Sequence, residues 1–253
     1  MRSTLVLTLF TAVLFGCANA QTPDEAASAA AAADDATPVV IADGTAPAEW
    51  VDVSGWTSPA IEPAYAAARA HWQAQDPAYE EEARVMAVAE GAFTEAGASQ
   101  QAVLYLMSLW PRCCPKLGIA IIQDGALVRN VAFEASDQDL AAVPDLDGDG
   151  RNELVLIGSF GMGGQETTGM TLVSFADAGL RTWGGTSIQD SACAAMQEGG
   201  TAARITAVPG PAFTIERFTM VSCDSGEWQP AGAPEPFEFT PPDEETSVEL
   251  PVR

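Results

Sequence analysis

Residues 145–153, with the sequence DLDGDGRNE, constrain the fold more tightly than any other stretch of this chain. Asp stands at positions 1, 3 and 5, Gly at position 6 and Glu at position 9, which is the spacing that wraps carboxylate oxygens around one Ca²⁺. A chain that turns this tightly needs a residue at positive φ, and Gly adopts such a φ without steric cost. The apolar run at residues 154–157 follows at once and predicts a buried strand.

Two kinds of calcium loop share this opening. An EF-hand closes its cage with a Glu at position 12 and continues as a helix. Here position 12 is Leu156, inside the aliphatic run, and Pro144 interrupts any helix that would enter the loop. The pattern instead resembles the calcium loop of FG-GAP/VCBS-type repeats, the blades of integrin-like propellers, in which the loop connects two antiparallel strands.

The resemblance implies a ligand set for Ca²⁺. Asp145, Asp147, Asp149 and Glu153 would be side-chain ligands, and the carbonyl of Arg151 would complete the set. An acidic, glycine-rich turn without an ion is the alternative, although four clustered carboxylates repel one another unless a cation neutralises them. Residues 93–97 and 101–104 resemble a degenerate copy of the same repeat, but they lack the Asp ligands, so we expect no metal there.

The remaining patterns predict a mainly antiparallel β fold with an N-terminal helical segment. Residues 61–75 have the spacing of a helix, with Pro63 in its first turn. Asp124-Gly125 is a hairpin signal between two strands. A propeller of four blades does not fit this length, so we expect one or two blade-like sheets or a sandwich. Expected strands lie in or near residues 84–94, 102–107, 118–123, 126–133, 153–160, 171–175, 203–207 and 213–221.

The N-terminal segment predicts export, and composition sets the expected limits of the folded domain. Residues 1–20 resemble a signal peptide, and two cleavage sites overlap there. One is a lipobox that ends at Cys17, which would be acylated, and the other is Ala18-Asn19-Ala20. We favour the lipobox because residues 21–46 are rich in Ala and Asp, as expected of a disordered tether. The domain with the calcium loop would then span residues 47–240, and residues 241–253 would form an acidic tail.

Charge and cysteine content narrow the function. The chain has 11 Lys and Arg against 35 Asp and Glu, a formal net charge of −24, which makes nucleic-acid binding unfavourable. In an exported chain, cysteines form disulfides. We expect Cys113 and Cys114 to be bridged to Cys193 and Cys223, in an order that the sequence leaves open. The pattern has no C-x-x-C, which argues against redox catalysis or zinc binding.

Three functions remain open. The favoured one is an exported, lipid-anchored, non-catalytic calcium-binding module that serves stability or contact with a protein or envelope partner, in the outer membrane or periplasm or, alternatively, secreted. A second is a metal-assisted hydrolase of a sugar or phosphoester that uses carboxylates such as Asp147 and Glu153. A third is a structural envelope protein with an incidental metal. His71, the one histidine, lies on the expected helix without a nucleophile motif elsewhere, so we expect it to pack or contact solvent.

Overall fold

The computed structural model describes residues 37–46, 52–76, 78–109, 115–177, 179–195, 199–208, 210–242 and 247–252. The expected signal segment with Cys17, and also Cys113 and Cys114, lie outside these residues. Within the described part the chain is built from antiparallel strands, and α2 (Ile61–Gln75) is its one α-helix. The expectation of a mainly antiparallel β fold is confirmed. No helix in this part has both the length and the apolar character needed to cross a bilayer.

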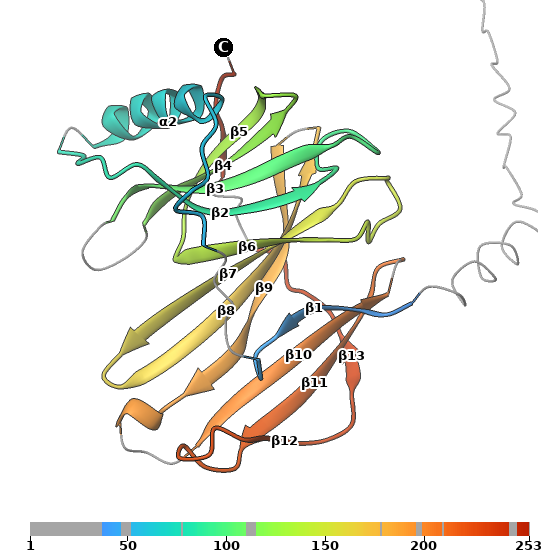
Figure 1. Ribbon diagram of the computed structural model, residues 1–253. Coiled ribbons are helices and arrows are strands. Elements are labelled where there is room, and N and C mark those ends of the chain that lie inside the picture. Colours follow the sequence, from blue (N-terminus) through green and yellow to red (C-terminus); the bar gives the residue numbers. More distant parts are fainter. Residues whose placement is uncertain are drawn as a thin grey trace, which may run out of the picture. The chain divides into compact units, whose positions relative to one another are not determined.

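One sheet has nine strands in the order β12-β11-β10-β9-β8-β7-β6, and β1 and β13 pair with β10 and β11 (Figure 1). We call it sheet A. Consecutive strands are neighbours, so it is a meander of hairpins, and its long central strands come from residues that the sequence leaves free of proline. Its strands are β1 (Val39–Asp43), β6 (Asp137–Val143), β7 (Glu153–Met162), β8 (Gln165–Ala176), β9 (Gly179–Ser191), β10 (Gly200–Val208), β11 (Ala212–Met220), β12 (Trp228–Pro230) and β13 (Glu235–Phe237).

The other sheet, sheet B, has five strands in the order β14-β5-β4-β3-β2. The turn between β4 and β5 is Asp124-Gly125, with φ of 52° and 76°, so the hairpin expected there is confirmed. In Figure 1, α2 covers one side of this sheet. Its strands are β2 (Arg84–Gly91), β3 (Gln100–Ser108), β4 (Lys116–Gln123), β5 (Ala126–Glu134) and β14 (Val248–Glu249).

Sheet B is buried on both faces, which explains the continuous apolar runs of β3 and β4. Leu104 and Ile119 pack with Leu154 and Phe175 of sheet A in one core. On the opposite face, Tyr105 and other side chains pack under α2, in a core to which the helix contributes Ala64, Ala68 and Trp72. A third core lies within sheet A and joins β7 to β10 and β11 through Val155, Ile205 and Ile215. The site described below lies where these layers meet.

The sequence placed the two ends of the folded part wrongly. Residues 39–43, inside the segment expected to be a disordered linker, form β1 and pair with β10 from Val39↔Ala207 to Asp43↔Arg204. Ile41 is buried there, so this short apolar run has a partner that composition alone does not reveal. Near the other end, β14 pairs with β5, and Leu250 is only 4% exposed. Part of the expected acidic tail therefore belongs to the core.

Two long strands of sheet A, β6 and β9, were also missed, for a related reason. The sequence of β6, DQDLAAV, has only two large aliphatic residues, Leu140 and Val143, and that of β9 contains a Gly-Gly pair. Neither run shows the β-branched enrichment of an independent strand. Both form because their neighbours supply a full ladder of pairs: β6 follows β7 from Val143↔Glu153 to Asp137↔Gly158, and β9 follows β8 along nearly its whole length.

Candidate metal centre

The acidic loop at residues 144–152 connects β6 to β7, which are antiparallel neighbours closed by the pair Val143↔Glu153. Strands flank the loop on both sides, whereas helices flank the loop of an EF-hand. Gly148 and Gly150 have φ of 80° and 84°, so two residues that a side chain would strain produce the tight turn. The sequence thus forms a tightly turned hairpin loop.

Three carboxylates converge in this loop. Asp145, Asp147 and Asp149 each place one carboxylate oxygen so that all lie within 4.8 Å of one another. Asp145 is held by backbone donors: its Oδ1 accepts from Gly148 N at 2.7 Å and its Oδ2 from Gly150 N at 2.8 Å. These bonds fix the orientation of the Asp145 carboxylate. The arrangement offers hard oxygen ligands, which is the donor chemistry that Ca²⁺ prefers.

Arg151 already engages one of the three carboxylates. Its Nε donates to Asp149 Oδ2 at 2.7 Å, its Nη2 contacts the same oxygen, and its backbone N donates to Asp149 Oδ1 at 2.9 Å. The side-chain hydrogen bond from Arg151 is the main cause that lowers the pKa of Asp149. A cation that takes Asp149 as a ligand must therefore compete with the Arg151 guanidinium. The resemblance assigned the carbonyl of Arg151, not its side chain, to the site.

Glu153 points into the protein behind the loop. It is 1% exposed, and its Oε2 accepts from Leu146 N at 2.9 Å. Burial, with smaller contributions from the charges of Asp147 and Asp145, raises the pKa of Glu153 to about 7, although the hydrogen bond from Leu146 opposes the shift. The converging group consists of the three Asp residues, whereas Glu153 accepts a hydrogen bond from the loop backbone at Leu146 N.

The loop is fastened to both sheets. Leu146 is fully buried in the third core, and its carbonyl accepts from Gly210 N at 2.9 Å. On the other side, Asn152 Oδ1 accepts from Ala92 N at 2.8 Å, its backbone N donates to Ala92 O, and its Nδ2 donates to Val143 O at 2.9 Å. Ala92 lies at the start of the β2–β3 connection in sheet B. Asn152 therefore ties the loop to the other sheet.

Sequence reasoning missed the role of Asn152. The available signal was a side chain with both a donor and an acceptor directly ahead of a buried strand, where backbone groups need partners. The connection that it reaches, residues 92–99, includes most of the degenerate repeat copy, so the two segments that resembled each other lie side by side. A Cβ on Gly150 would come within 2.7 Å of the Ala96 Cβ, which shows how closely they approach.

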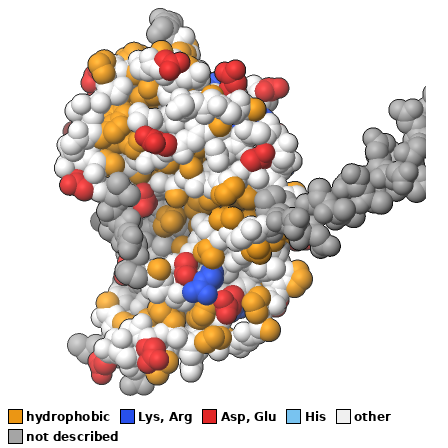
Figure 2. Space-filling model, turned by 45° about the vertical axis from the view of Figure 1, so that its right-hand side comes forward, with side chains coloured by type: hydrophobic (Ala, Val, Ile, Leu, Met, Phe, Trp, Pro, Cys, Tyr) orange, Lys and Arg blue, Asp and Glu red, His pale blue; other side chains and the backbone are white. Residues whose placement is uncertain are grey.

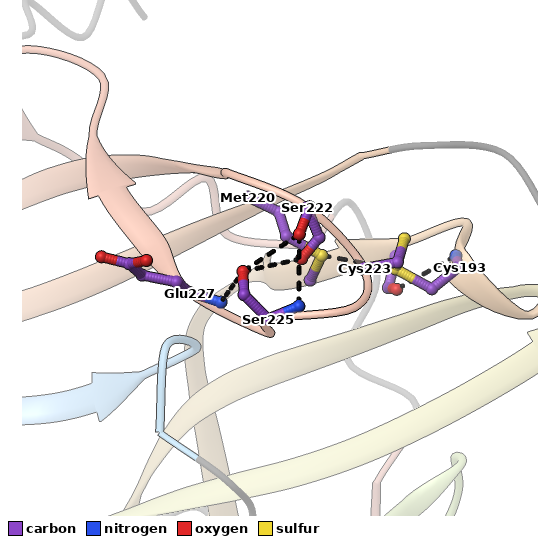
Figure 3. Close-up of a disulfide and its surroundings, with 7 residues drawn as sticks. Cys193, Met220, Ser222, Cys223, Ser225 and Glu227 are labelled. Atoms are coloured by element: carbon purple, nitrogen blue, oxygen red, sulfur yellow. Dashed lines mark hydrogen bonds between the residues drawn. A yellow bond between two sulfur atoms is a disulfide. The ribbon is translucent and has the colours of Figure 1, made fainter.

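The disulfide expectation needs a correction. Cys193 and Cys223 are bonded to each other, not to Cys113 and Cys114 (Figure 3). The reason is topological: Cys193 follows β9 and Cys223 follows β11, and both strands flank β10, so their ends meet at one end of sheet A. Met220 Sδ lies 3.3 Å from Cys193 Sγ, and Ser225 N donates to Ser222 Oγ in the turn beside the bridge.

His71 lies on α2 and takes part in packing. Its ring contacts the Trp72 ring edge-on at 4.6 Å between centroids, and its Nε2 lies 2.7 Å from Gln75 Nε2. Burial lowers the pKa of His71, with a further contribution from the charge of Lys116.

Comparisons with protein-family models, with curated proteins and with solved structures found no match.

Proposed function

We propose that this chain is an exported, lipid-anchored, non-catalytic module in which one Ca²⁺ in the β6–β7 loop stabilises the domain and shapes a surface for a protein or envelope partner. The observation that carries the proposal is the convergence of Asp145, Asp147 and Asp149 on a loop fastened at both ends. The export and anchoring through Cys17 rest on the sequence of residues 1–20. The proposed location is the outer membrane or the periplasm.

The residues present fit a calcium ion. Ca²⁺ takes six to eight oxygen ligands at flexible geometry, from carboxylates, backbone carbonyls and water. The three Asp side chains would hold it, and carbonyls of the loop and water would complete the shell. The bound ion would supply positive charge where the like charges of these side chains otherwise repel. The exposure of Asp147 and Asp149 leaves room for water ligands.

Thermal melts of the whole protein with calcium and with a chelator test the proposal. At a calcium level about a hundredfold above the dissociation constant, binding adds roughly 2.7 kcal/mol. For a domain of this size that raises the melting temperature by about 5–11 °C. Asp147→Ala should abolish the rise, whereas Asp224→Ala, which removes an exposed carboxylate far along the chain beside the disulfide, should keep it. Identical wild-type melts in both conditions would refute calcium binding.

A further inference from the structure

The tip of the β7–β8 hairpin has an unpaired backbone edge. β6 follows β7 only as far as Asp137↔Gly158, whereas β7 continues to Met162 and pairs with β8 as far as Met162↔Gln165. Figure 1 shows the hairpin running on past the end of β6. Among the described strands, none pairs with the outer side of residues 159–162. A free strand edge of this kind is a template for another extended chain.

The direction of the free backbone groups follows from one contact. Ser159 O accepts from Gln138 Nε2 at 3.2 Å, and Gln138 belongs to β6, so the Ser159 backbone points to the outer side. Backbone groups alternate along a strand, so the N–H and C=O of Gly161 point outward as well. Phe160 and Met162 direct their backbone groups to β8. The edge therefore offers the Gly161 donor and acceptor to a new strand.

Natural edges are normally protected by Lys, Pro or inward charges. Between Asn152 and Leu180 the sequence has no Lys, Arg or Pro. Phe160 and Met162 lie on the same face of β7 and are 55% and 72% exposed. The edge thus combines the free hydrogen-bonding groups of Gly161 with an apolar face, and no Lys, Arg or Pro in this stretch opposes pairing.

The opposite face of the same tip is acidic. Gly161 pairs with Glu166 of β8, so the two residues share a face, and Gly161 places no side chain between Glu166 and the free edge. A Cβ at Gly161 would meet nothing closer than Gln165 O at 3.7 Å, so that path is open. Glu166 is exposed and belongs to none of the ion pairs between described residues.

These features select the occupant. Strands in a sheet lie about 4.8 Å apart, so a residue added beside Gly161 would have its Cα roughly 10 Å from that of Glu166. A Lys or Arg side chain on the added strand can cross this gap to meet the carboxylate. Its two neighbours in sequence would point to the other face, toward Phe160 and Met162. The geometry thus calls for a basic residue between two apolar ones.

We propose that residues 159–162 of β7 are a docking site for an extended segment of a partner protein that carries a Lys or Arg between two apolar residues. The net charge of −24 favours a basic partner over a second copy of this chain, which would be repelled. On the face shown in Figure 2, red acidic side chains are widely spread and blue basic ones are few. This site is separate from the metal loop and does not depend on the ion.

The probe is a capped pentapeptide with one lysine between two valines, titrated into the whole isotope-labelled protein and followed by NMR. The chemical-shift changes caused by the peptide should be confined to the backbone amides of residues 158–168. Two N-methylated versions give the matched control, because methylating N–H groups that face β7 abolishes pairing, whereas methylating those that face away does not. Equal binding of both versions, shifts elsewhere, or no binding at millimolar peptide would overturn the proposal.

The charge contact is tested by a cycle of two changes. Glu166→Gln should weaken binding of the lysine peptide by about twofold to fivefold at low salt and leave a norleucine version unchanged, as expected for an exposed ion pair. Gly161→Val, for which there is open space, should also weaken binding of the lysine peptide and leave the norleucine version unchanged. The Val side chain would stand between the lysine and the Glu166 carboxylate. Equal loss for both peptides would overturn the lysine contact. Two results would overturn the choice of a peptide occupant. One is that the free protein forms dimers that Phe160→Ser abolishes, and the other is that it floats with lipid vesicles and Phe160→Ser abolishes the flotation.

Discussion

Replacing Asn152 with Ala should destabilise the domain more than any other change in the exposed part of the β6–β7 loop. The side chain makes two hydrogen bonds, from Ala92 N and to Val143 O. Ala92 is 8% exposed, so its N–H would lose its partner without full access to water. A net hydrogen bond contributes about 0.5–1.5 kcal/mol, and an orphaned buried donor costs about 1–3 kcal/mol. We expect a total loss of about 2–4 kcal/mol.

The assay is denaturant unfolding of the whole protein in the presence of chelator, so that the ion does not contribute. The expected loss corresponds to a fall in melting temperature of about 4–16 °C. Asn152→Asp keeps the acceptor for Ala92 N and loses the donor to Val143 O, so it should fall between wild type and Asn152→Ala. Gln138→Ala is the matched control, because Gln138 makes one exposed hydrogen bond on the same hairpin and should cost less than about 0.5 kcal/mol. Equal effects of Asn152→Ala and Gln138→Ala would refute the reasoning.

Three further predictions concern other parts of the fold. Burial raises the pKa of Asp137 to about 6 from 3.8, so its contribution to stability is complete below about pH 4 and is lost as pH rises through about 6. Asp137→Asn should therefore remove about 1–3 kcal/mol of the decline in the free energy of unfolding between these pH values. The measurement is unfolding at a series of pH values in the presence of chelator. Replacing both Cys193 and Cys223 with Ser opens a crosslink that spans 30 residues and should cost about 3–4 kcal/mol in equilibrium unfolding, an effect that reduction of wild type should reproduce. Tyr105→Phe removes the buried hydroxyl that donates to Asn130 Oδ1 at 2.7 Å, and should lower the free energy of unfolding by about 1–3 kcal/mol; no loss would show that Asn130 finds another donor.

The elements that the sequence predicts well are those with a local signal. Residues 61–75 form a helix with the expected bounds because Pro63 and the apolar spacing act within the segment itself. The Asp124-Gly125 turn is equally local. By contrast, β1 and β14 are short and form only because β10 and β5 have free edges for them. Such pairings depend on residues far away in sequence, which periodicity cannot detect.

The same distinction applies to the site. The spacing of Asp145, Asp147 and Asp149 within one turn predicts their convergence, because neighbouring carboxylates in a tight loop have few other directions to take. Spacing does not tell which way Glu153 faces, since the first residue of a strand can point either into the core or out of it. The Cys193–Cys223 pairing depends on strand order, which cysteine positions alone leave open.

The anchoring of the β6–β7 loop decides how repulsion among its carboxylates affects the stability of the two sheets. Leu146 anchors it in the core of sheet A, Asn152 anchors it to sheet B, and only the segment between them is exposed. Repulsion among the three Asp carboxylates cannot be relieved by swinging the whole loop outward, because that would expose Leu146 and break the Ala92 pairing. The proposed ion, by removing this repulsion, would therefore act on both sheets. In Asn152→Ala the side-chain hydrogen bond to Ala92 N is lost and only the backbone bond to Ala92 O still joins Asn152 to sheet B. The proposed calcium-dependent rise in melting temperature should therefore be smaller than in wild type, although all three Asp side chains remain.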